Sequence, residues 1–194
     1  MFDPFNKEKS DFLKKKDKSK KGSIDRDIVK LVNGVNSKND YYATSSCAGR
    51  IVLQEVKSRK KNECSWIFAK HDKVKFSEII ESLKKHQKNK KTKHEIWFKQ
   101  QPLILHIACR NLESAKIFLD LSRKIFRRAG IIGLNERKIT IEIIGSEHLE
   151  TVVKDKHFVA DEKYLKQLIK YANRNFEENK RKIKKFFRNL KAFC

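Results

Sequence analysis

The feature that most constrains the fold of this chain is the grouping of strand-like segments into clusters that helical segments separate. Runs rich in β-branched and aromatic residues predict strands at 41–46, 50–56, 65–70, 94–99, 103–109 and 138–144, with one or two short strands within 151–160. Apolar and basic patterning predicts helices at 10–16, 24–36, 76–83, 112–126 and 161–190. Strands that cluster in this way favour an α+β fold over a doubly wound parallel sheet.

The lysine-rich stretch Lys84–Lys93 is the clearest change of composition and separates the clusters into two halves. A chain of 194 residues suits one compact domain, or one domain made of two similar halves. We therefore expect a single domain over residues 1–194, with halves at about 7–85 and 94–191.

The charge of the chain is strongly unbalanced. It carries 47 Lys and Arg residues but only 24 Asp and Glu residues, a formal net charge of +23 at pH 7. The lysine bias of thermophilic proteins usually raises glutamate as well, so this excess favours a polyanionic partner. Nucleic acid is the first candidate, because phosphate neutralisation releases counterions and supplies affinity. A membrane surface is a weaker candidate, because no lipidation motif is present.

The cysteines and the N-terminus exclude several classes of protein. The four cysteines lie far apart in the sequence (Cys47, Cys64, Cys109 and Cys194), whereas zinc ligands usually come as closely spaced pairs, so we expect no metal. The first residues have no apolar signal core, and no apolar stretch is long enough to span a bilayer. We expect a reduced, cytoplasmic protein without a membrane segment, and nothing requires an obligatory protein partner.

The run from Asp40 to Arg50 is the most informative stretch for function. It begins like a strand and then places three small polar side chains at 45–47 before Gly49 and Arg50. Small side chains add little to a core, but their hydroxyl groups can hydrogen-bond a ligand, and Arg50 can hold a phosphate or a carboxylate. A polar strand end is the alternative interpretation of the same residues.

Three further segments accompany this run: 17–25 (DKSKKGSID), 65–71 (SWIFAKH) and 101–106 (QPLILH). In this order and at these intervals, the chain resembles the tRNA wybutosine-synthesising methyltransferase family, the third protein of that pathway. The resemblance extends from about Lys7 to Leu190. It implies a duplicated α+β arrangement in which strands of both halves form one barrel-like mixed sheet with helices outside.

The resemblance also implies an activity. The family transfers a methyl group from S-adenosylmethionine to the ring nitrogen at position 4 of a 4-demethylwyosine-type guanosine 37 in phenylalanine tRNA. Transfer of this kind is an in-line displacement that depends mainly on positioning. The chain has no glycine-rich turn of the dinucleotide-binding kind, so the use of S-adenosylmethionine is implied by the resemblance alone.

The acceptor nitrogen must present a lone pair, so a base must take its proton. The resemblance makes His71 and Asp25 the catalytic candidates, with His106 behind them. Each residue has an alternative interpretation. His71 can be an ordinary histidine at a strand end, Asp25 can complement the N-terminus of the helix that follows, and His106 can be a core histidine.

The remaining candidates would bind substrate or cofactor. Ser45 and Ser46 would hydrogen-bond the substrate or the amino-acid end of the cofactor, and Cys47 would form a small wall of the pocket. Arg50 would pair with a phosphate or with the cofactor carboxylate.

Lys21 is a candidate for phosphate binding, with a solvated loop lysine as the alternative. Trp66 would stack on a flipped base or on adenine, with a buried core tryptophan as the alternative. The chain departs from the family pattern at Lys70, where relatives usually carry Ser, and at Gln101, where they usually carry an acidic residue. Two rival functions stay open: a non-catalytic basic RNA-binding protein, and a methyltransferase that acts on another tRNA guanosine.

Overall fold

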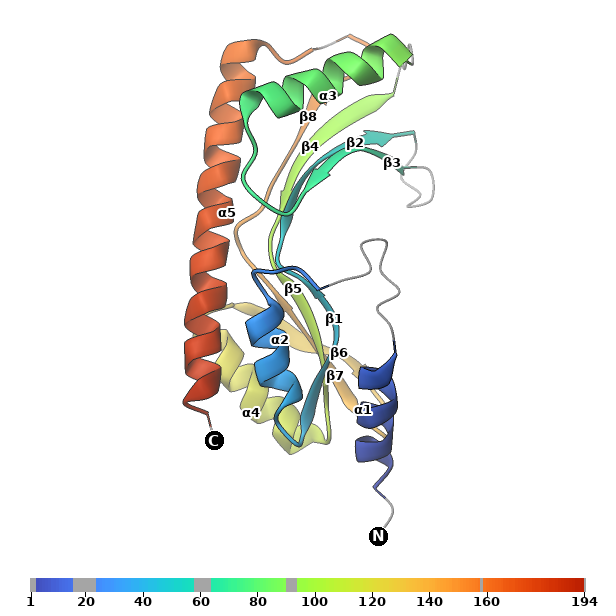
Figure 1. The fold of residues 1–194 in the computed structure, drawn as a ribbon, viewed down its shortest axis with the longest axis vertical. Coiled ribbons are helices and arrows are strands. Elements are labelled where there is room, and N and C mark those ends of the chain that lie inside the picture. The colour runs from blue at the N-terminus through green and yellow to red at the C-terminus, as the bar shows by residue number, and fades with distance from the viewer. Residues whose placement is uncertain (1–2, 16–23, 58–63, 90–93, 158, 194) are drawn as a thin grey trace. The chain divides into compact units, whose positions relative to one another are not determined.

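The computed structural model describes residues 3–15, 24–57, 64–89, 94–157 and 159–193. The chain forms two compact units that are interleaved along the sequence (Figure 1). Unit 1 consists of Met1–Ala48, Leu103–Ser146 and Asn179–Cys194, and unit 2 consists of Gly49–Pro102 and Glu147–Glu178.

Unit 1 contains a four-stranded antiparallel sheet in the order β1-β5-β7-β6. Its strands are β1 (Tyr41–Cys47), β5 (Ile104–Cys109), β6 (Arg128–Leu134) and β7 (Ile139–Ile144). Its helices are α1 (Pro4–Lys14), α2 (Val29–Asn36), α4 (Leu112–Arg123) and the last turns of α5 (Glu162–Lys191).

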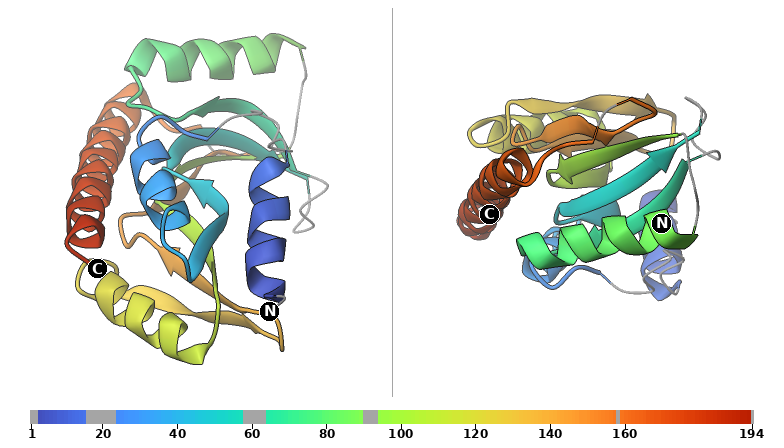
Figure 2. Two further views of the ribbon diagram at one scale, coloured as in Figure 1. Left: turned by 60° about the horizontal axis from the view of Figure 1, so that its bottom comes forward. Right: turned by 90° about the horizontal axis from the view of Figure 1, so that it is seen from above.

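Alternation along β1 decides how the helices of unit 1 pack, because successive side chains of a strand point to opposite faces. Tyr41 and Ala43 belong to the main core, to which α2, α4 and the end of α5 contribute. Tyr42 points to the other face and packs against α1, where its ring centroid lies 5.5 Å from that of Phe5. The views in Figures 1 and 2 show α1 on the opposite side of this sheet from α2 and α4.

Unit 2 contains a second four-stranded antiparallel sheet, in the order β3-β2-β4-β8. Its strands are β2 (Arg50–Val56), β3 (Cys64–Lys70), β4 (Glu95–Gln101) and β8 (Leu149–Lys154), and its helices are α3 (Phe76–Asn89) and the first turns of α5. One face of the sheet carries Ile51, Leu53 and Phe98, which pack with Ile79 of α3 and Phe176 of α5.

The α+β class that the sequence predicts is confirmed. The single barrel-like mixed sheet is not confirmed. The described strands form two separate sheets, and within each sheet every described pair of neighbouring strands is antiparallel. The duplication into halves at 7–85 and 94–191 stays a prediction.

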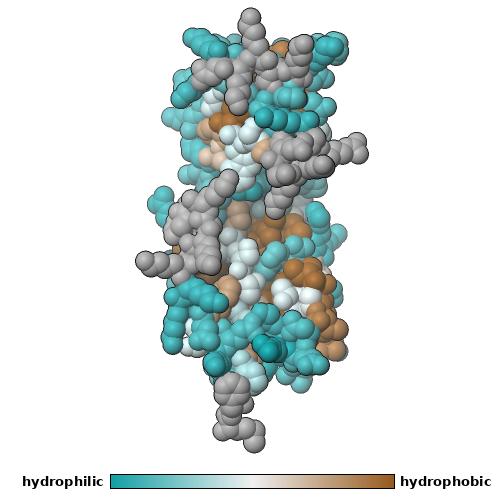
Figure 3. Space-filling model, turned by 90° about the vertical axis from the view of Figure 1, so that its right-hand side faces the viewer, coloured by the Kyte–Doolittle hydropathy of each residue, from teal (hydrophilic) through white to brown (hydrophobic). Residues whose placement is uncertain are grey.

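Strand β6 is absent from the sequence-based prediction. It is an edge strand, and it exposes Ile131, Ile132 and Leu134 by 44, 53 and 72 %. Apolar residues therefore do not alternate with polar ones along it, and the two-residue period that marks a half-buried strand is missing. Hydrophobic residues that reach the surface in this way are brown in Figure 3.

Candidate active site

In unit 1, Asp25 is tied to the residue that follows β1. Its carboxylate accepts a hydrogen bond from the backbone N–H of Ala48 at 2.9 Å, and only 5 % of the residue is exposed. A carboxylate oxygen also lies within 4.8 Å of the thiol sulfur of Cys47. Because α2 begins only at Val29, Asp25 lies outside its first turn, so the helix-complementing interpretation is not supported.

The other side of Ala48 is held by Asn179, a fully buried residue of α5. The Asn179 side-chain amide donates to the carbonyl of Ala48 at 2.7 Å, and its oxygen accepts from the N–H of Leu103 at 2.9 Å. Both backbone groups of Ala48 therefore have fixed partners. Gly49 follows with a φ angle of 100°, a left-handed conformation that favours glycine.

Sequence analysis missed Asn179, although a signal exists. The residue lies on the apolar stripe of α5, three positions after Phe176 and four before Ile183, and both of these residues are buried. An amide in such a position must find hydrogen-bond partners when it is buried. A polar residue inside an apolar stripe therefore predicts a clamp, by which we mean a buried side chain that hydrogen-bonds backbone groups of other segments, as Asn179 does with Ala48 and Leu103.

Ser45, His106 and Glu142 lie in one row across β1, β5 and β7. Ser45 is opposite His106, and His106 is opposite Glu142. The Nε2 atom of His106 lies 2.8 Å from a carboxylate oxygen of Glu142. His106 is half-buried and does not belong to the core cluster that contains its neighbours Leu105 and Ile107, so it is not a core histidine.

The row has a chemical consequence. When the imidazole is neutral and Nε2 donates to the carboxylate, the Nδ1 atom carries the lone pair, so Glu142 can fix the tautomer of His106. Ser45 is exposed, and its hydroxyl is available to a ligand, whereas Ser46 is half-buried and pairs with Leu105.

In unit 2, Arg50 and Trp66 come together on the sheet. The guanidinium carbon of Arg50 lies 4.2 Å from the ring centroid of Trp66, which is 48 % exposed and is therefore not a core tryptophan. The Nε atom of Arg50 donates to the side-chain oxygen of Gln101 at 2.6 Å. Gln101 is neutral, so this contact leaves the positive charge of Arg50 uncompensated.

His71 directly follows β3 and is half-buried. The chain around it is held on both sides. Lys70 pairs with Glu78 of α3 at 2.6 Å and lowers the pKa of that carboxyl group below its ordinary value of 4.5. Val74 exchanges hydrogen bonds of 3.0 and 2.9 Å with the side chain of Asn173 through both its N–H and its carbonyl. Lys21 lies outside the described residues.

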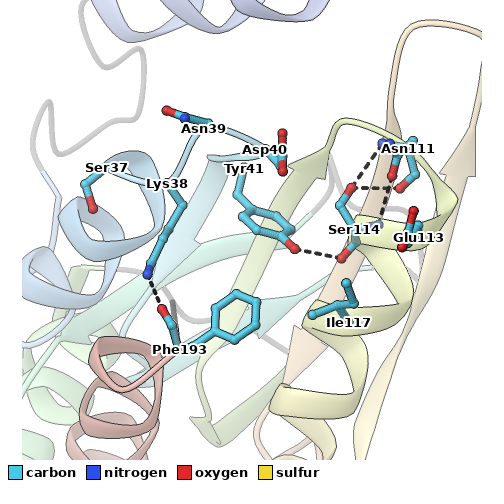
Figure 4. A pocket seen from close by; sticks show the side chains of 10 residues that line it. All are labelled: Ser37, Lys38, Asn39, Asp40, Tyr41, Asn111, Glu113, Ser114, Ile117 and Phe193. Atoms are coloured by element: carbon cyan, nitrogen blue, oxygen red, sulfur yellow. Dashed lines mark hydrogen bonds between the residues drawn. The ribbon is translucent and has the colours of Figure 1, made fainter.

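The hollow shown in Figure 4 lies elsewhere in unit 1. It has a volume of about 590 Å³, and its walls include Tyr41, Asn111 and Ser114. The hydroxyl of Tyr41 donates to the carbonyl of Ser114 at 3.0 Å, and burial raises the pKa of Tyr41 to about 12. Tyr41 begins β1, whereas the residues at 45–47 end it, so this hollow is not the candidate site.

The fold defines the class of the protein. It matches an α+β structure, PH1069 from Pyrococcus horikoshii, with a TM-score of 0.84 and 28 % identity over 98 % of both chains. Within that class, the chain belongs to the methyltransferase TYW3 family, whose model matches residues 7–192. The matched range contains every candidate residue of the site.

Curated relatives are similar over most of the chain. The tRNA wybutosine-synthesizing protein 3 homolog of Danio rerio is 34 % identical over 98 % of this chain and 76 % of its own length. The human homolog is 33 % identical over 96 % of this chain and 72 % of its own length. A Pyrococcus abyssi relative, 29 % identical over 86 % of this chain and 85 % of its own length, is named tRNA(Phe) 7-((3-amino-3-carboxypropyl)-4-demethylwyosine(37)-N(4))-methyltransferase 1.

Proposed function

We propose that this protein is an S-adenosylmethionine-dependent methyltransferase that methylates nitrogen 4 of a 4-demethylwyosine-type guanosine 37 in phenylalanine tRNA. The observation that carries the proposal is the family match across residues 7–192. The name of the Pyrococcus abyssi relative supports the tRNA, the nucleoside and the nitrogen. The net charge of +23 supports a polyanionic substrate.

The proposal assigns the base to His71 or Asp25, as the family pattern implies. Asp25 is well suited because its carboxylate is buried and held by the N–H of Ala48, so that little reorganisation precedes proton transfer. His71 is well suited because an imidazole titrates near neutral pH. His106, which Glu142 orients, is the third candidate.

The residues present fit the cofactor in kind. S-adenosylmethionine supplies an electrophilic methyl group on a sulfonium, and its amino-acid end needs hydrogen-bond donors. Ser45 is exposed at the end of β1 and would serve this end together with Ser46, while Cys47 would line the wall. Arg50, whose charge Gln101 leaves uncompensated, would take a phosphate of the tRNA. Lys21 would add a second phosphate contact.

The proposal includes a cytoplasmic location and the duplicated halves that the family pattern implies. Among the helices that the structure describes, none has the length and hydrophobicity that crossing a membrane demands.

Mass spectrometry of nucleosides tests the function directly. Phenylalanine tRNA that carries the demethyl tricyclic base is incubated with the protein, with and without S-adenosylmethionine. We expect a gain of one methyl group on the tricyclic nucleoside, and only with the cofactor. If the protein binds the tRNA but transfers no methyl group, the non-catalytic RNA-binding function replaces the proposal. Methylation of another nucleoside would instead establish a different tRNA target.

Variants separate chemistry from binding in the same assay. His71→Ala and Asp25→Ala should lower turnover far more than tRNA affinity. Equal losses in both quantities would make these residues binding or folding residues and would remove them from the chemical step.

A further inference from the structure

Both tryptophans of the chain lie in one row of the unit 2 sheet. The sequence contains two tryptophans, Trp66 on β3 and Trp97 on β4. Each is directly opposite Gln54, the β2 residue between them, and directly opposed residues of antiparallel strands share a face. The two positions are thus two strand spacings apart, about 10 Å. That separation leaves room for a different flat ligand on each ring.

This face is not the one that the helices of unit 2 cover. The core residues Ile51, Leu53 and Phe98 belong to the opposite face, and α3 and α5 pack there. Trp66 is 48 % exposed and Trp97 is half-buried. Figure 1 shows α3 and α5 beside this sheet, and the described helices of unit 2 contribute their apolar residues to that single core.

Each tryptophan carries its own cation. The guanidinium of Arg50 lies 4.2 Å from the ring centroid of Trp66, and the ammonium of Lys99 lies 5.1 Å from that of Trp97. Trp97 is further held by the hydrogen bond from its indole N–H to Glu95 at 2.8 Å. Two rings, each with a positive charge beside it, suit a ligand that alternates flat bases with phosphates.

We propose that this face of the unit 2 sheet, formed by Trp66, Trp97, Arg50 and Lys99, binds unpaired nucleotides of RNA by stacking one base on each tryptophan. The cations beside the rings contact the phosphates. Aromatic side chains on a four-stranded sheet stack two or three bases in other RNA-binding domains, and such stacking tolerates any base. Single-stranded RNA is favoured over a duplex, because paired bases do not expose their faces. The inference rests on the proposed function only in that the RNA would be the tRNA substrate.

Acidic residues restrain the surface: Glu95 accepts the indole hydrogen bond of Trp97, and Glu150 pairs with Lys99. Lys99 pairs with Glu150 of β8 at 2.5 Å, so binding a phosphate requires Lys99 to exchange this partner. Removal of the Glu150 charge should therefore strengthen RNA binding, and by more than removal of an exposed acidic charge far from this face, because it also releases Lys99.

The test uses the full chain and a short oligouridylate, which forms no stable structure. Because this face contains both tryptophans, the intrinsic fluorescence of the protein reports on it directly. Bound oligouridylate should quench that fluorescence, and Trp66→Phe and Trp97→Phe should each lose part of the quenching. A duplex RNA of equal length should bind with less quenching.

Affinity, measured by the anisotropy of labelled oligouridylate, identifies the contacts. Trp97→Ala should weaken binding about 5- to 150-fold, because the stacking of one base contributes about 1–3 kcal/mol. The matched control is Tyr171→Ala. Tyr171 on α5 is 47 % exposed and has Arg174 over its ring at 4.9 Å, but it lies on a helix rather than on this face. The Tyr171→Ala variant should bind oligouridylate with unchanged affinity, and the Glu150→Gln variant should bind it more tightly.

The binding measurements alone decide this inference, and the methylation assay tests the proposed function separately. Unchanged affinity in Trp97→Ala, or equal losses in Trp97→Ala and Tyr171→Ala, would overturn the inference. If the protein methylates the tRNA but fails these tests, only this inference fails. If it passes them but transfers no methyl group, only the proposed function fails. Trp97→Phe, which keeps an aromatic ring, distinguishes loss of stacking from loss of folding.

Discussion

The clamp that Asn179 forms around Ala48 makes a quantitative prediction. In Asn179→Ala, the carbonyl of Ala48 and the N–H of Leu103 both lose a hydrogen-bond partner, and both residues are almost completely buried. Each buried backbone group left without a partner costs about 1–3 kcal/mol. Alanine has a higher helix propensity than asparagine, which offsets about 0.5 kcal/mol. We therefore expect a loss of about 2–5 kcal/mol in the free energy of unfolding.

Urea unfolding followed by far-ultraviolet circular dichroism measures this loss. The matched control is Asn189→Ala, which makes the same substitution on the same helix at a half-buried position. It should change the free energy of unfolding by no more than about 0.5 kcal/mol, in the stabilising direction. The difference between the two variants then isolates the clamp.

The same variant should also affect the candidate active site. Ala48 donates its N–H to Asp25, so releasing its carbonyl should also loosen the position of that carboxylate. We expect methyl transfer to fall in Asn179→Ala under conditions in which the variant is still folded. If Asn179→Ala and Asn189→Ala unfold at the same urea concentration, the clamp does not stabilise the protein and the reasoning is refuted.

Three further predictions follow from single contacts. Gln101→Glu should neutralise Arg50, weaken tRNA binding and reduce its salt slope by about one, and an unchanged slope would remove Arg50 from phosphate binding. Glu142→Gln should lower the turnover of methyl transfer if His106 is the base, because the carboxylate that orients the imidazole is lost, whereas unchanged turnover would exclude that role. Lys70 lowers the pKa of Glu78, so the stabilisation from this pair is present above pH 4.5 and is lost as the pH falls through the lowered pKa. The urea midpoint of Glu78→Gln should therefore decline less steeply below pH 4.5 than that of the unchanged protein. Equal declines in the two proteins would contradict this role of the pair.

Local patterns were enough to predict the class of fold and most of its elements. The strand that becomes β1 and the turn after it are readable, because two aromatics and a threonine favour a strand and Gly49 permits the φ angle of 100°. The edge strand β6 could not be predicted from the sequence. Its exposed isoleucines do not alternate with polar residues, and its position is determined by pairing with β7.

The candidate site was only partly predictable for the same reason. The proximity of Arg50 and Trp66 depends on the register between β2 and β3, which no local pattern encodes. Glu142 and Trp97 have ordinary strand positions in the sequence, and only cross-strand pairing gives them their neighbours. Residues whose neighbours depend on long-range strand register therefore cannot be assigned to the site from the sequence alone.

The interleaving of the two units has a consequence for how the protein is made. Phe176 completes the core of unit 2, and Phe186 and Leu190 complete the core of unit 1, so both depend on the same final helix. During synthesis, neither core can close until that helix has left the ribosome, and the nascent chain must expose two unfinished sheets until then. A stop codon upstream of Glu162 would therefore abolish both units at once rather than release one intact.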